Sequence, residues 1–197
     1  MEVSIEDLKR NYKGFSDAEL IRIATKDASD LREDAIRVLQ EEIKSRGLSV
    51  ELFKGVEVQR KQITEEEFSD YCKLLQKLPC PVCGSVSHKL NATVTSKVMS
   101  FIVITNYEKK LVIGCPACLS KANSNALVSS ALLGWWGIPW GFIRTIQAII
   151  FNNKMSRLIW HEEPSDYFRG FVLRNVGVVE ANKTNNDRLQ SLIRNLS

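Results

Sequence analysis

Four cysteines in two matched pairs constrain this chain more than any other feature. The first pair lies in PCPVCGS, residues 79–85, and the second in GCPACLS, residues 114–120. Each pair has two intervening residues, and 31 residues separate the pairs. Turns of this kind direct two thiolates toward one ion, and four thiolates suit tetrahedral Zn²⁺. We therefore predict a closed, structural zinc site. Its ligands are Cys80, Cys83, Cys115 and Cys118.

The spacer between the pairs is longer than the roughly 15–20 residues of the common zinc-binding pattern. Its composition explains the excess, because LNATVTS alternates with period two and MSFIVIT is β-branched and apolar. Residues 86–114 are thus predicted to form two or three antiparallel strands. The chain resembles a zinc ribbon from Cys80 to Cys118.

Other uses of the cysteines stay open at this stage. The second pair follows LVIG and precedes a helical pattern, which is also the local context of a thioredoxin-like redox pair. An iron–sulfur cluster could use four thiolates, and His88 could replace one ligand. We predict instead that His88 is an exposed strand residue and that Cys72 is a small buried side chain.

The odd cysteine count and a charged N-terminus without an apolar h-region indicate a reducing compartment. We expect a cytoplasmic location or the cytoplasmic face of the inner membrane.

A run of 22 residues, 122–143, carries no charged side chain and includes LLGWWGIPWGF. Its glycines and Pro139 would interrupt a continuous transmembrane helix. We therefore predict two short apolar helices, at about 120–133 and 142–151, joined by an aromatic elbow. The indoles of Trp135, Trp136 and Trp140 suit a membrane–water interface. Two alternatives remain: the hairpin packs in a soluble core or oligomer interface, or it forms a ligand platform.

This stretch also carries a resemblance. The pattern L-G-W-W-G-I-P-W-G-x-I-x-T, from Leu133 to Thr145, is similar to a motif in uncharacterised bacterial proteins, some with zinc-ribbon or J-domain segments. The resemblance covers roughly residues 79–155 and implies a membrane setting. It implies no activity and no catalytic residues.

The flanking segments are predicted to be helical. Ser16 and Glu19 form a capping box, and Gly47 ends a helix that begins near residue 31. The N-terminal segment that contains these residues resembles a short helical module of uncharacterised bacterial proteins. The resemblance implies a docking or packing unit. Ser49 is predicted to cap a further helix, and Thr64 with Glu67 to cap the next. Ser165 is predicted to cap a helix in the C-terminal tail, where a final amphipathic helix follows residue 186.

The predicted fold class is α+β and mostly helical. The expected domains are an N-terminal helical module (1–48), a linker and helix (49–78), the zinc ribbon (79–119), the apolar helical hairpin (120–151) and a polar helical tail (152–197).

No catalytic constellation emerges, because the chain has two histidines and no phosphate-binding loop, dinucleotide fingerprint or nucleophile elbow. We expect a non-enzymatic protein that binds structural zinc and acts as a binding or scaffolding module. Its expected partners are a membrane surface, or a protein or second copy bound through the apolar hairpin. A soluble nucleic-acid-binding ribbon is the alternative, although the net charge of +4 favours it weakly. A zinc-stabilised homo-oligomer is another.

Overall fold

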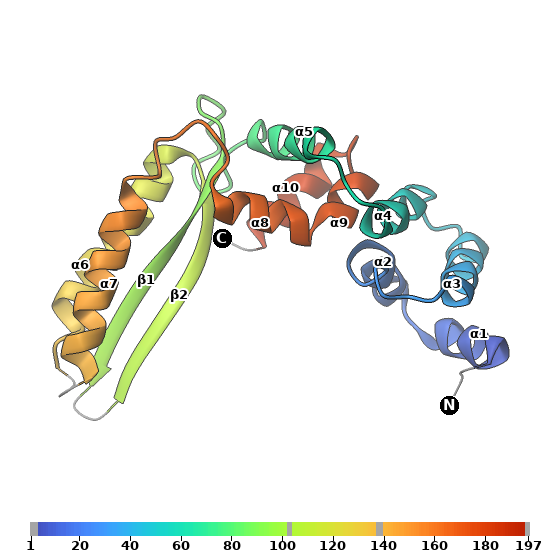
Figure 1. Cartoon of the computed structure of the whole chain (residues 1–197), viewed down its shortest axis with the longest axis horizontal. Coiled ribbons are helices and arrows are strands. Elements are labelled where there is room, and N and C mark those ends of the chain that lie inside the picture. Colours follow the sequence, from blue (N-terminus) through green and yellow to red (C-terminus); the bar gives the residue numbers. More distant parts are fainter. Residues whose placement is uncertain (1–3, 102–103, 137–139, 196–197) are drawn as a thin grey trace. The chain divides into compact units, whose positions relative to one another are not determined.

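The computed structural model describes residues 4–101, 104–136 and 140–195. Its elements are α1 (Ile5–Gly14), α2 (Asp17–Lys26), α3 (Glu33–Ser45), α4 (Glu51–Arg60), α5 (Glu65–Gln76), β1 (Asn91–Phe101), β2 (Ile104–Gly114), α6 (Pro116–Leu133), α7 (Trp140–Ser156), α8 (Asp166–Arg174), α9 (Val176–Ala181) and α10 (Asn186–Arg194) (Figure 1). Helices dominate and one small antiparallel sheet is present, which confirms the predicted α+β class.

The chain divides into two compact units. Unit 1 consists of Met1–Tyr71 and Phe171–Leu189, and unit 2 consists of Cys72–Gly170 and Gln190–Ser197. The zinc ribbon and apolar hairpin, expected as separate segments from the sequence, thus fall in one unit. The tail from residue 152 contributes to both units.

Local signals in the sequence account for the helix ends of unit 1. Ser16 and Glu19 form the predicted capping box, with Glu19 N–H donating to the Ser16 hydroxyl and Ser16 N–H donating to the Glu19 carboxylate. Gly47 adopts a φ of +66°, and the Leu48 N–H donates to the Ile43 carbonyl, as a glycine-terminated helix requires. Ser49 lies one residue before the observed cap, Val50, and its hydroxyl accepts from the Glu51 N–H. The predicted cap is therefore displaced by one position.

Arg46, the C-cap residue of α3, connects this helix to the end of α1. Its guanidinium donates to the carbonyl oxygens of Tyr12, Lys13 and Phe15 at 2.7–3.1 Å. These carbonyls lie where a helix end leaves acceptors without intrahelical partners. The arginine thus has a structural function in the module.

Helices α2, α4 and α9 approach one another closely through glycines. A Cβ atom on Gly177 would lie 2.4 Å from the Thr25 carbonyl oxygen, and one on Gly55 would lie 2.8 Å from the Gly177 carbonyl oxygen. Only glycine leaves room for backbone at these distances. This contact brings the C-terminal part of the chain into the core of unit 1.

Unit 2 is built on the antiparallel pair of β1 and β2. The register runs from Asn91 opposite Gly114 to Phe101 opposite Ile104. Among the described residues these two strands form the only sheet. The sequence predicted two or three strands in this region, and two are present.

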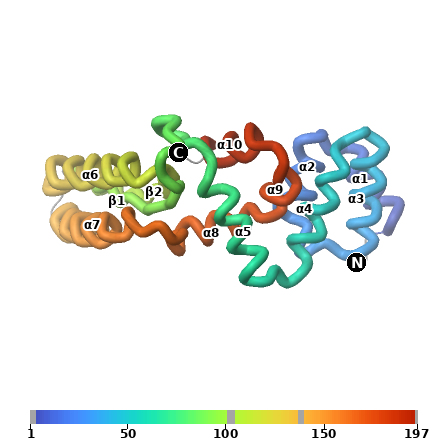
Figure 2. The backbone as a smooth tube through the Cα atoms, turned by 90° about the horizontal axis from the view of Figure 1, so that it is seen from above, coloured from blue at the N-terminus to red at the C-terminus, as the bar shows by residue number. Residues whose placement is uncertain are grey.

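Strand β1 lies with its free edge between α6 and α7, which flank the strand pair in Figure 2. In a two-stranded ribbon this edge has no backbone partner. The Asn152 side-chain amide takes the place of a neighbouring strand at Ser96. Its Oδ1 accepts from the Ser96 N–H at 2.8 Å, and its Nδ2 donates to the Ser96 carbonyl at 2.7 Å. The Ser130 hydroxyl accepts from the Val98 N–H at 3.0 Å. Side chains of two helices thus complete the edge of the sheet.

Candidate metal centre and apolar hairpin

The four paired cysteines converge at one end of unit 2. Their Sγ atoms all lie within 4.8 Å of one another, and the Sγ atoms of Cys83 and Cys115 are 3.7 Å apart. Four sulfurs around one Zn²⁺ at about 2.3 Å would be separated by roughly 3.8 Å. A disulfide would require about 2.05 Å. The spacing therefore fits four thiolates around a single ion, and the geometry could bind a metal.

The first pair lies on a tight turn after α5. The Gly84 N–H donates to the Cys80 carbonyl at 2.8 Å, and the Cys80 N–H donates to the Ser85 carbonyl at 2.9 Å. Gly84 has a φ of +74°, a left-handed conformation that favours glycine at this position of the turn. The turn leaves Cys80 buried and Cys83 exposed.

The second pair differs from the first, because it begins a helix. Cys115 is the N-cap of α6, Pro116 follows it at the first helical position, and Cys118 lies in the first turn. The partial positive charge of a helix N-terminus favours thiolates. The predicted helix from residue 120 therefore starts earlier, inside the cysteine motif, and the cluster is joined rigidly to α6.

Hydrogen bonding and burial act in opposite directions on these thiols. Burial raises the pKa of Cys80, but backbone N–H groups donate to its sulfur and lower the pKa to about 7. The donors belong to Cys115, Cys83 and Val82. Burial and the neighbouring sulfurs raise the pKa of Cys118. A cation bound among these four sulfurs would stabilise their thiolate forms.

The other candidate ligands lie outside this cluster. Among the described residues, the only group of three or more metal-ligating side chains is the four cysteines. His88 is exposed ahead of β1, and Cys72 is buried in α5 without a disulfide. The predicted environment of Cys72 is thus confirmed. His88 is also exposed as predicted, although it precedes the strand.

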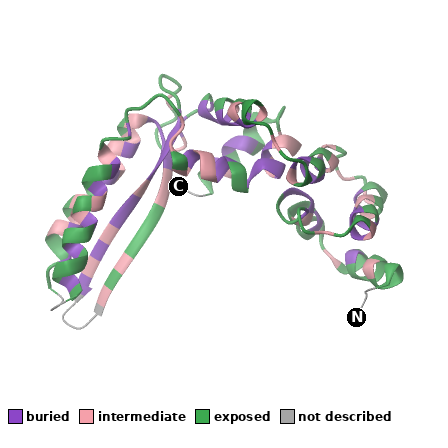
Figure 3. Ribbon diagram, viewed as in Figure 1, coloured by how far each residue is buried: buried purple, intermediate pink, exposed green. Residues whose placement is uncertain are grey.

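The apolar hairpin consists of α6 and α7, which pack against each other and against β1. Their outer faces are exposed (Figure 3) although they carry large apolar side chains. These side chains are Val128, Leu132, Leu133, Phe142, Ile143, Ile146 and Ile150. On soluble proteins, large exposed apolar patches are uncommon and are often interaction sites.

The buried residues of the same helices are mostly small or polar. These are Asn123, Ala126 and Ser130 on α6, and Gly141, Thr145, Ala148 and Asn152 on α7. Two larger apolar side chains, Leu119 and Met155, are also buried, toward the ends of the helices away from the tip. Asn123 Nδ2 donates to the Asn152 carbonyl at 2.8 Å and so links the helices. Helices of a water-soluble core usually show the opposite distribution, with apolar residues inside. Small residues with interhelical hydrogen bonds are typical of helix contacts in membranes.

Two glycines of the predicted elbow permit this close packing. Gly134 is the C-cap of α6 and has a φ of −81°. A left-handed backbone conformation is therefore not the reason for a glycine at this position. A Cβ atom on Gly141 would lie 2.7 Å from the Gly134 carbonyl oxygen. The predicted contributions of Gly137 and Pro139 fall outside the described residues. Helix α7 also extends beyond the predicted end at residue 151 and ends at Ser156. Asn152 is buried within the helix and does not begin a polar tail.

The three tryptophans of the hairpin lie at its tip. Trp135 is 39 %, Trp136 70 % and Trp140 64 % exposed, so none is a buried core anchor of this chain. The indole N–H groups of Trp135 and Trp136 donate to the carbonyls of Ala131 and Leu132. These are carbonyls of the last turn of α6, where water would otherwise bind. The tip therefore presents apolar ring surface, and two of its three indole N–H groups already donate to backbone carbonyls.

Among the described residues, no helix combines the length and the apolar character that crossing a bilayer requires.

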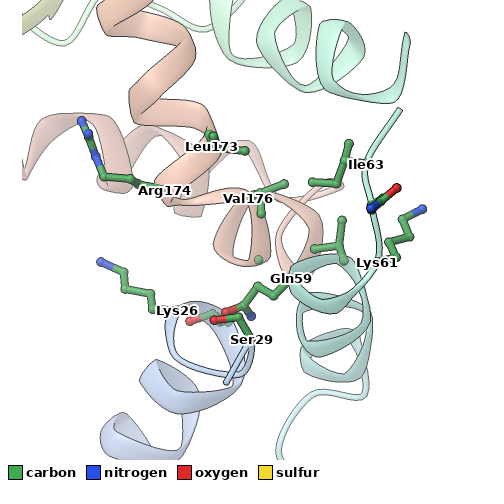
Figure 4. A pocket seen from close by; sticks show the side chains of 12 residues that line it. Lys26, Ser29, Gln59, Lys61, Ile63, Leu173, Arg174 and Val176 are labelled. Carbon is green, nitrogen blue, oxygen red and sulfur yellow. The ribbon is translucent and has the colours of Figure 1, made fainter. Parts of the chain in front are cut away.

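Unit 1 contains a groove of about 670 Å³, shown in Figure 4. Gln59 lies at its wall with its amide fully engaged, donating to the Ala24 and Gly55 carbonyls and accepting from the Ala28 N–H. Lys61 is paired with Glu67 at 2.8 Å. The lining residues include no cysteine, histidine or carboxylate. The groove therefore offers neither a metal site nor an acid–base pair.

No family model matches the chain, and neither a curated protein nor a solved structure shows significant similarity to it.

Proposed function

We propose that this chain is a non-enzymatic membrane-surface module whose hairpin is held in place by a structural Zn²⁺. The observation that carries the proposal is the distribution of side chains in the tip half of α6 and α7, where large apolar side chains are exposed and small or polar side chains are buried. Lipid is the partner that stabilises such an exterior, and the helices would lie in the interface without crossing the bilayer.

The cysteine cluster supports the structural part of this proposal. Its four sulfurs leave no ligand position open for a substrate, as in structural zinc sites. Zinc fits better than an iron–sulfur cluster because sulfurs this close together have room for one ion. The ion would fix the first turn of α6 to the turn at Cys80–Cys83, and so fix the base of the hairpin.

Flotation with phospholipid vesicles tests the membrane part. We expect the purified chain to float with the vesicles and its tryptophan emission to shift to the blue. The double variant Leu132→Ser/Trp136→Ser removes two of the most exposed apolar side chains. Burying such a side chain contributes about 1.5–3 kcal/mol, so vesicle affinity should fall at least ~10-fold.

The matched control is Val50→Ser/Leu173→Ser, which removes exposed apolar side chains from unit 1. This control should float like the unchanged chain. A chain that forms a defined oligomer in detergent-free buffer and never floats would refute membrane binding. It would favour self-association through the same surface.

A further inference from the structure

Beside the tip of the hairpin, α7 and β2 line an open cavity of about 620 Å³. Its lining consists of Thr105, Asn106, Tyr107, Trp140 and Arg144. A hydroxyl, an amide and a guanidinium thus face one space beside two aromatic rings. The exposed apolar side chains Phe142 and Ile143 lie on the same turn of α7.

Two cations contact aromatic rings here: Arg144, which lines the cavity, and Lys109, which lies beside it. The guanidinium carbon of Arg144 lies 5.3 Å from the centroid of the Tyr107 ring. The Lys109 ammonium lies 4.6 Å from the Phe151 centroid and 5.9 Å from that of Tyr107. These distances are in the range of cation–π contacts. Tyr107 on β2 thus orients both charges toward the α7 side of the ribbon.

Neither charge is neutralised by the protein. In the described part of the chain, no carboxylate lies within ion-pair distance of Arg144 or Lys109, and the Arg144 guanidinium donates to the neutral amide of Gln147 at 3.1 Å. A planar guanidinium with free donors matches the geometry of a phosphate. The cavity is therefore complementary to an anion with several acceptor oxygens.

We propose that this cavity binds the phosphate of an anionic phospholipid headgroup. The inference rests on the membrane association proposed above and adds the lipid class. The apolar tip selects among phosphate ligands, because only a lipid places a phosphate beside acyl chains. Arg144 and Lys109 would contact the headgroup, while Tyr107 and Trp140 would lie at the level where aromatic residues gather in membrane interfaces.

Flotation with two kinds of vesicle tests the assignment: phosphatidylcholine alone, and phosphatidylcholine mixed with phosphatidylglycerol. The unchanged chain should bind the mixed vesicles more tightly, by about fivefold for each cation near the surface. Arg144→Gln/Lys109→Gln should lose this preference and retain its binding to phosphatidylcholine. Both side chains are exposed, so zinc content and circular dichroism should show an unchanged fold.

The matched control is Lys97→Gln/Lys110→Gln, which removes the same charge from the α6 side of the ribbon. It should keep most of the preference for anionic vesicles. Equal losses in the two variants would refute a defined site, and so would equal binding of the unchanged chain to both vesicles. Displacement from vesicles by soluble glycerol phosphate would assign the cavity to free phosphate ligands instead. Failure to bind either vesicle would refute the proposed membrane association itself.

Discussion

Replacement of Cys83 by serine is expected to abolish metal binding and to unfold the cysteine end of unit 2. The Cys83 side chain is exposed, so an isosteric serine costs little packing energy. Structural zinc contributes about 10–16 kcal/mol of binding free energy in zinc fingers, which is comparable with the whole stability of a typical domain, about 5–15 kcal/mol. Elemental analysis should find no stoichiometric zinc in the variant. Amide exchange should lose protection first where Asn91 pairs with Gly114.

Cys72→Ser is the control for this experiment. Cys72 is buried but lies outside the cluster, so this variant should keep one zinc per chain even if its unfolding midpoint falls. Zinc retained at full stoichiometry in Cys83→Ser would show that the cysteines are not the ligands.

Asn152→Ala is expected to lower the free energy of unfolding of unit 2 by about 1–3 kcal/mol, because it leaves one buried group, the Ser96 N–H, without its partner. The Ser96 carbonyl also loses the Asn152 amide but keeps the Ser130 hydroxyl at 3.4 Å. Tryptophan emission during urea unfolding measures this loss. It reports on unit 2 alone, because all four tryptophans of the chain lie there.

Asn153→Ala provides the comparison, since it changes the same residue type in the same helix at an exposed position. Its effect should stay within about 0.5 kcal/mol. If the two variants unfold at the same urea concentration, the edge of β1 does not depend on Asn152.

The sequence predicted the cysteine cluster well, because the spacing of the four cysteines can be read directly from two short motifs. It also predicted most helix ends, since capping boxes such as Ser16 with Glu19 are local and depend little on the rest of the fold. The boundary of the hairpin was harder to predict. Asn152 and Asn153 looked like the start of a polar tail, yet α7 continues through them.

The polar interior of the hairpin was missed for a physical reason. Its contacts join residues that are distant in sequence, such as Ser96 and Asn152. No local sequence pattern indicates that the edge of a strand will lie between two helices. A signal was nevertheless present: small and polar residues recur at intervals of three and four in both helices. Asn123, Ala126 and Ser130 follow this interval on α6, and Gly141, Thr145 and Ala148 follow it on α7. The cavity at Tyr107 and Arg144 had no comparable signal, because it forms only when β2 meets α7.

The metal content of the unchanged chain tests the account most directly. The chain would be purified under reducing conditions and examined by elemental analysis and zinc-edge X-ray absorption. We predict one Zn²⁺ per chain with four sulfur ligands at about 2.3 Å. A chain that folds without metal, or a zinc shell with nitrogen or oxygen in place of sulfur, would contradict the account.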